Sequence, residues 1–165
     1  MDKKRLNIAL LVSEFEDGYT RSLCEGAVSA AKELDANLYI FPGRYLEAQN
    51  YELYRTKYDY HFNSLFSYAT ASEYDAILIS MGTIAGNVDL ETKIEFLRQF
   101  KGDNIITISA KIEGYPSVCF DNSSGFYKGI SHLIEAHKCR RIGFVSGAMT
   151  SDDAMQRLDT YRKCL

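Results

Sequence analysis

Continuous apolar runs alternate with stretches of helical periodicity along this chain, and this alternation is what most constrains its fold. A run that is apolar throughout is typical of a strand buried on both faces, and helices between successive strands make the strands parallel. Five such runs are Ile8 to Val12, Leu38 to Phe41, Ala76 to Met81, Ile105 to Ile108 and Val118 to Phe120. The sequence therefore predicts an α/β fold, a parallel sheet flanked by helices.

The same alternation continues beyond the fifth run. A helical stripe is followed by a short apolar run, Ile142 to Val145, and then by a last helical pattern. The stripe comprises Tyr127, Ile130, Leu133 and Ile134, and the last pattern comprises Ala154, Leu158, Tyr161 and Leu165. We predict that Ile142 to Val145 forms a strand of a second unit rather than a sixth strand of the first sheet.

Composition excludes several classes of partner. The 165 residues carry a net charge of −3, which gives no general attraction to nucleic acid or to an anionic membrane. The apolar run near the N-terminus is too short to span a membrane and lacks a cleavage site, so we do not expect secretion. Cys24, Cys119, Cys139 and Cys164 form no Cys-x-x-Cys motif and are expected to be free thiols in a reducing cytoplasm.

The motifs of common catalytic sites are missing from the sequence. It has no phosphate-binding Gly-x-x-x-x-Gly-Lys-Ser/Thr loop and no Gly-x-Ser-x-Gly turn, and Ser80-Met81-Gly82 stands where a phospho-receiver domain needs aspartate. His61, His132 and His137 are isolated in sequence, and a zinc site from His137 and Cys139 would lack further ligands. We predict no catalytic residue, no metal and no cofactor, and keep a small α/β enzyme as the weaker alternative.

Polar residues follow three of the expected strands. They occur in the turns Ser13-Glu14-Phe15, Ser80-Met81-Gly82-Thr83 and Asp121-Asn122. The carboxyl ends of parallel strands meet at one edge of a sheet, where α/β proteins bind ligands. These turns are therefore the candidate site, and Asp121 is expected to accept hydrogen bonds from ligand hydroxyls rather than to act as a base.

A tyrosine-rich segment interrupts the alternation between the second strand and the third. Tyr45, Tyr51, Tyr54, Tyr58 and Tyr60 are interleaved there with acidic and basic side chains. One interpretation is a half-buried segment that packs its rings on the scaffold. The other is a contact surface, because tyrosine and arginine are enriched in interfaces.

Five stretches carry a family resemblance. They are Asn7 to Ser13, Pro116 to Asn122, Gly125 to Ile134, Arg140 to Gly147 and Gln156 to Tyr161. In this order and spacing they resemble the effector domains of the lactose/galactose-repressor family, which share the type I periplasmic-binding-protein fold. The resemblance implies two lobes that close on a sugar or other small metabolite. Together with the alternation of strands and helices, it implies the strand order 2-1-3-4-5 in the first sheet.

The resemblance also implies a division of the chain and a set of ligand-binding residues. Residues 1–122 would form the first lobe and residues 123–165 the start of the second. Asp121 matches a carboxylate that binds ligand hydroxyls, and Arg157 matches an arginine that reaches the ligand from the second lobe. The turn residues Ser13, Glu14, Phe15, Met81 and Gly82 would line the first lobe's side of the cleft. A carboxylate and a forked guanidinium suit a sugar-like or anionic effector.

The chain departs from the family pattern in three ways. No helix-turn-helix precedes the first strand, Thr160 replaces a glycine, and the chain ends at Leu165, inside the second lobe. With the tyrosine-rich insert, these features resemble the sensor halves of cytoplasmic signal-transduction proteins, which control an output module such as a diguanylate cyclase (GGDEF) domain. The alternative is an effector-binding fragment of a repressor without its DNA-binding head. In either case this chain would make no direct contact with nucleic acid or membrane. Its exposed apolar faces predict a homo-oligomer.

Overall fold

The computed structural model describes residues 4–46, 59–70, 74–100 and 104–165. Its strands are β1 (Asn7–Val12), β2 (Asn37–Pro42), β3 (Ala76–Ile79), β4 (Ile105–Ile108) and β5 (Ser117–Val118). Its helices are α1 (Gly18–Glu33), the 3-10 helix η2 (Asp59–Thr70), α2 (Met81–Ile84), α3 (Leu90–Arg98), α4 (Asn122–Glu135) and α5 (Asp152–Cys164). Among these residues, no helix has both the length and the apolar character needed to cross a membrane.

All five strands are parallel and lie in the order β2-β1-β3-β4-β5. The predicted fold class and strand order are therefore confirmed. The predicted strand ends were less accurate at two places. Met81 begins α2 instead of ending β3, and β5 is Ser117–Val118 instead of extending to Phe120.

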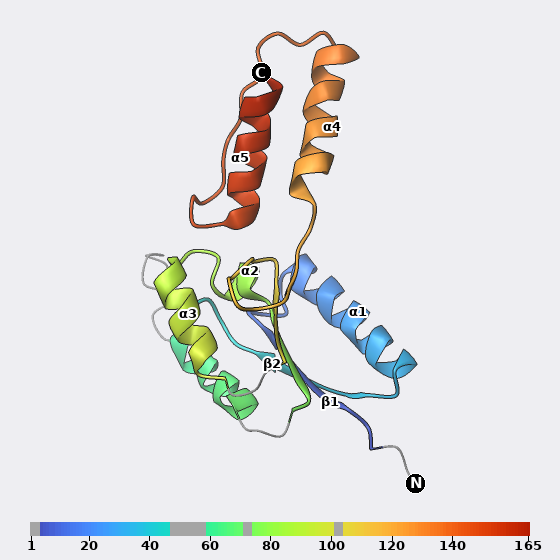
Figure 1. Ribbon diagram of the computed structural model, residues 1–165, viewed down its shortest axis with the longest axis vertical. Helices are drawn as coiled ribbons and strands as arrows, with labels where there is room; N and C mark the ends of the chain where they lie inside the picture. The colour runs from blue at the N-terminus through green and yellow to red at the C-terminus, as the bar shows by residue number, and fades with distance from the viewer. Residues whose placement is uncertain (1–3, 47–58, 71–73, 101–103) are drawn as a thin grey trace.

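Helices cover both faces of this sheet, α1 on one side and α3 on the other (Figure 1). The central strand β1 shows why, since alternate side chains of a strand point to opposite faces. Ala9 and Leu11 belong to one fully buried cluster, and Leu10 and Val12 belong to a second. We call β1–β5 with α1, η2, α2 and α3 the sheet body.

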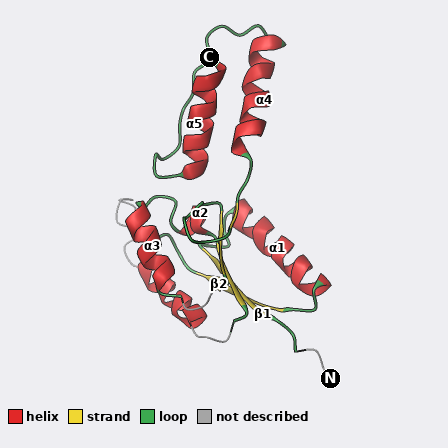
Figure 2. Cartoon of the chain, in the orientation of Figure 1, coloured by secondary structure: helices red, strands yellow, loops and turns green. Residues whose placement is uncertain are grey.

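Helices α4 and α5 lie side by side beyond the carboxyl edge of the sheet (Figure 2). We call them the helical pair. The connection between them includes 142–145, where the structure has no strand, so that strand prediction was wrong. A strand needs a neighbouring strand to pair its backbone groups. Here Val145 is 96% exposed, and the carbonyl of Ile142 accepts a hydrogen bond from the Tyr161 hydroxyl at 2.6 Å instead of from a strand.

Three hydrogen bonds connect the helical pair to the sheet body at the start of α5. The Lys93 ammonium donates to the carbonyl of Thr150 at 3.0 Å, and the Thr150 hydroxyl donates to the carbonyl of Gly86 at 2.9 Å. The backbone N–H of Lys111 donates to a carboxylate oxygen of Asp152 at 3.3 Å. These bonds hold the N-terminus of α5 close to the carboxyl edge of the sheet.

Candidate ligand-binding site

The carboxyl edge of the sheet carries a row of serines. Ser13 follows β1, Ser80 follows β3 and Ser109 follows β4, and they are 0%, 1% and 9% exposed. Ser80 accepts a hydrogen bond from the Thr83 hydroxyl at 2.9 Å, and Ser109 shares one with the Tyr19 hydroxyl at 2.8 Å. This edge of the sheet is therefore rich in hydroxyl groups.

Ser13 differs from the other two serines. Its hydroxyl oxygen is buried and has no hydrogen-bond partner among the described residues. A buried polar group without a partner costs about 1–3 kcal/mol. A polar group could relieve that cost only by reaching a side chain that is 0% exposed, so the contribution of Ser13 to a ligand site stays a prediction.

The other two residues of the first turn lie in different surroundings. Glu14 accepts a hydrogen bond from the Tyr45 hydroxyl at 3.3 Å and lies 3.6 Å from the Arg44 guanidinium. Phe15 is 45% exposed and lines a groove on α1 with Arg21. Of the tyrosine-rich segment, Tyr45 lies among residues the structure describes, while Tyr51, Tyr54 and Tyr58 and the side chain of Tyr60 lie outside them, so both interpretations of that segment stay open.

The turn after β3 is shaped by close packing. Met81 is fully buried and belongs to the core of the sheet body. A Cβ atom at Gly82 would lie 2.5 Å from the Cβ of Ser109 and 2.8 Å from its carbonyl oxygen. Gly82 thus lets α2 approach the end of β4, and the contribution of these two residues to a ligand site stays a prediction.

Asp121 is the N-cap of α4. Its carboxylate accepts a hydrogen bond from the backbone N–H of Ser124 at 3.0 Å. The hydrogen bond from the Ser124 backbone, followed by one from the Ser124 side chain, lowers the pKa of Asp121. The carboxylate is therefore ionised at neutral pH, and it is exposed to solvent.

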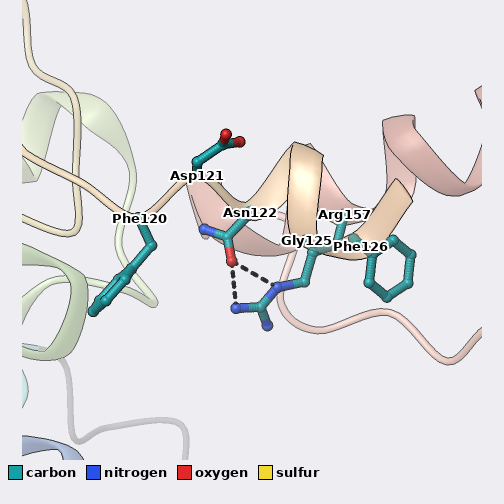
Figure 3. Close-up of a pocket in the computed structure, with 6 residues that line it drawn as sticks. All are labelled: Phe120, Asp121, Asn122, Gly125, Phe126 and Arg157. Atoms are coloured by element: carbon teal, nitrogen blue, oxygen red, sulfur yellow. Dashed lines mark hydrogen bonds between the residues drawn. The ribbon is translucent and has the colours of Figure 1, made fainter. Parts of the chain in front are cut away.

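Arg157 of α5 is hydrogen-bonded to Asn122 of α4, the residue that follows Asp121. Its Nε and Nη2 donate to the side-chain oxygen of Asn122 at 3.0 and 2.7 Å (Figure 3). The Asn122 amide nitrogen in turn donates to Asp153 at 2.8 Å. Asn122 therefore orients the guanidinium and joins the N-terminal ends of α4 and α5.

Asp121 and Arg157 line the same open pocket of about 510 Å³, together with Phe120, Asn122, Gly125 and Phe126. Figure 3 shows the Asp121 carboxylate directed away from the guanidinium, so the two charges are not paired with each other. The structure thus brings together the two residues that the resemblance singled out. Ser13, Glu14, Phe15, Met81 and Gly82 do not line this pocket.

Tyr19 and Ser109 were not predicted as site residues. The Tyr19 ring meets the Phe120 ring edge to face, with centroids 6.2 Å apart, while its hydroxyl contacts Ser109. Tyr19 lies in the first turn of α1, which follows a strand end and is capped by Asp17. That position at the carboxyl edge was the signal in the sequence that would have identified it.

Thr160, which departs from the family pattern, fits α5 without distortion. It is 6% exposed, and its hydroxyl donates to the carbonyl of Gln156 one turn earlier at 2.7 Å. A threonine in a helix commonly satisfies its hydroxyl in this way. The substitution therefore leaves Arg157, three residues earlier, on a regular helix.

Comparisons with known proteins rest on structure, because no protein-family model and no curated protein matches this sequence. A lac repressor dimer bound to operator and the anti-inducer ONPF superimposes with a TM-score of 0.70 at 18% identity, covering 99% of this chain and 52% of that one. A LacI-family transcriptional regulator from Mycobacterium smegmatis gives 0.72 at 19% identity, covering 96% and 50%. The Escherichia coli repressor AscG gives 0.64 at 19% identity, covering 97% and 53%.

The chain has the fold of LacI-family regulators. The likeness runs over nearly its whole length, and the chain spans about half the length of these solved structures. At such identities the likeness establishes the fold alone. Whether the chain shares the function of these regulators depends on the residues of its site.

Proposed function

We propose that this chain is the effector-binding part of a LacI-type transcription regulator. The observation that carries the proposal is the shared pocket of Asp121 and Arg157 beside the hydroxyl-rich carboxyl edge of a LacI-type fold. In this proposal residues 1–122 form the first lobe of the sensing domain and residues 123–165 begin the second. Its task is binding rather than catalysis, in the cytoplasm.

The charges of the pocket define the effector class. An ionised carboxylate such as Asp121 accepts hydrogen bonds from hydroxyl groups, and a guanidinium donates to hydroxyls or to an anion. Phe120 and Phe126 add apolar surface beside these groups. The expected effector is therefore a sugar-like or anionic metabolite, with the unpartnered Ser13 hydroxyl available as the cleft closes.

The structural neighbours support this proposal at a coarser level. The lac repressor and AscG are repressors, and the lac repressor structure contains operator and the anti-inducer ONPF. The lac repressor is described as a dimer, and we extend homo-oligomerisation to this chain as part of the proposal. Nothing in the fold or in these likenesses supports a diguanylate cyclase output, so the repressor alternative is preferred to the signalling sensor.

The test is a thermal-shift screen of sugars, sugar acids and sugar phosphates. It is run on the 165-residue chain and on the product of the complete gene, followed by calorimetric titration of each compound that binds. Because a hydrogen bond to a charged group is worth about 1.5–3 kcal/mol, Asp121→Ala and Arg157→Ala should each weaken binding by roughly 10- to 100-fold. We expect the full effect in the complete protein, where both lobes enclose the effector.

Two matched variants separate binding from stability. Asp89 caps α3 just as Asp121 caps α4, accepting from the Thr92 backbone N–H at 2.9 Å, but it lies outside the pocket. Arg162 lies on α5 like Arg157 and pairs with Asp159 instead. Asp89→Ala and Arg162→Ala should leave affinity unchanged. Unaltered binding in Asp121→Ala and Arg157→Ala, or a screen without a ligand for either protein, would overturn the proposal.

A further inference from the structure

The C-terminus of α4 brings together two histidines that are five residues apart. The helix ends at Glu135, and Lys138 adopts a left-handed conformation with φ of 54°. The carbonyl of His132 accepts from the backbone N–H of Ala136 at 2.9 Å, and the carbonyl of Leu133 accepts from that of Cys139 at 3.0 Å. This turn folds the chain back, so that His137 returns to the side of His132.

The two imidazole rings face each other through their Nε2 atoms. These nitrogens are 3.1 Å apart, and the ring centroids are 4.8 Å apart with planes inclined at 81°. The axis of each ring is taken as the line from its centroid through its Nε2. If the two axes meet symmetrically at one position, the separations of the nitrogens and of the centroids place that position about 2.1 Å beyond each Nε2. This is close to the Zn–N bond length of about 2.0–2.1 Å. In the chain without metal the two nitrogens share a hydrogen bond whose donor depends on the tautomer, and a metal ion would take the place of its proton.

We propose that His132 and His137 form a bidentate site for a divalent transition-metal ion of the nickel, copper and zinc group. Neutral imidazole suits these ions, and both residues are exposed, so an ion reaches them without a change in fold. The negative end of the α4 dipole lies at the same place and favours a cation.

The protein supplies only two ligands to this site. Within the described part of the chain there is no group of three or more His, Cys, Asp or Glu side chains that fits a metal ion. Water therefore completes the coordination, and the ion exchanges readily. The partner of His137 is His132 across the helix end, and the Cys139 sulfur lies 4.0 Å from the carbonyl oxygen of His137.

The test is a calorimetric titration of the 165-residue chain with NiCl₂, with ZnCl₂ as a second probe. We expect one ion per chain, and a loss of affinity of at least about tenfold in His132→Gln and in His137→Gln, because each variant leaves a single ligand. His61→Gln removes the third histidine, and Cys139→Ser removes the neighbouring thiol. Both should bind nickel as the unaltered chain does.

A measurement on the unaltered chain keeps the proposal independent of variant folding. In two-dimensional NMR of the imidazole nitrogens, ZnCl₂ should shift the Nε2 signals of His132 and His137 together and leave those of His61 in place. Full affinity in either glutamine variant would overturn the site. So would its loss in Cys139→Ser, a zinc response of only one of the two rings, or the absence of nickel binding to the unaltered chain.

Discussion

The sheet body and the helical pair are built from similar apolar patterns but bury them to very different extents. In β1 the residues from Ala9 to Val12 are all 0% exposed. On α4, Ile130 is buried, whereas Tyr127 and Leu133 of the same predicted stripe are 54% and 37% exposed. An amphipathic stripe therefore specifies which face of a helix is apolar, and the amount of burial depends on what packs against that face.

The helical pair is stabilised by directional contacts instead. Rings of Phe126, Phe144 and Tyr161 pack in sequence, with centroids 5.4 and 5.1 Å apart. The Arg157–Asn122–Asp153 hydrogen bonds join the start of α4 to α5, one turn of α4 away from Phe126. Since net hydrogen bonds contribute about 1 kcal/mol each and are exposed here, we expect the pair to open more readily than the sheet body.

The largest expected contrast comes from deleting the same side chain in each region. Leu11→Ala leaves a cavity in a fully buried cluster and should lower the free energy of unfolding by about 2–5 kcal/mol. Leu133→Ala removes a side chain that is 37% exposed and should cost less than about 1 kcal/mol. Urea denaturation monitored by circular dichroism measures both. Equal losses would mean that the two regions are packed alike and would end the contrast.

The sequence was sufficient for the five strands of the sheet body, apart from two of their ends, because the signals of strands are local. Each strand was recognisable from its own apolar run, and the alternation with helices made the sheet parallel; the order 2-1-3-4-5 followed with the family resemblance. The sequence did not predict η2 or α2. The strand expected at 142–145 failed because strand formation depends on a neighbour that no local pattern contains. Asp121 and Arg157 were predicted from motifs and line one pocket, and their role in binding stays a prediction. Tyr19 was overlooked although it closely follows a predicted strand end, whereas the pairing of His132 with His137 depends on a left-handed turn that spacing along the chain does not reveal.

A contrast of intermediate size comes from adding one methyl group to a glycine of each region. At Gly82 the new Cβ would meet Ser109 at 2.5 Å, against backbone and a short side chain that cannot move away easily. Gly82→Ala should therefore cost about 1–3 kcal/mol. At Gly129, within α4, nothing lies within 4 Å of the new Cβ, so Gly129→Ala should stabilise the helix by up to about 1 kcal/mol.

Thermal denaturation of the two glycine variants gives the comparison directly. Opposite signs of the change in melting temperature would show tight packing at the sheet edge and open space on α4. A stabilised Gly82→Ala would show that α2 moves away from β4 without cost, which contradicts the packing described here.

The smallest expected effect concerns the helix caps and their pH dependence. The hydrogen bond from the Thr20 hydroxyl, with those from the Thr20 and Tyr19 backbone, lowers the pKa of Asp17. A carboxyl whose pKa is lower in the folded state adds stability that is present above its unfolded pKa, about 3.9, and lost as pH falls through the folded value. Asp17→Asn should therefore be less stable than the unaltered chain at pH 7, by less than about 1 kcal/mol because the group is only partly buried. The difference should shrink below pH 4. Asp121 makes fewer hydrogen bonds at the start of α4, with the Ser124 backbone contributing most to its lowered pKa. Asp121→Asn should therefore show the same trend more weakly.

Urea denaturation at pH 7, 5 and 3 tests this order of the two caps. A larger pH-dependent change for Asp121→Asn would place the stronger cap in the helical pair and reverse the contrast between the two regions.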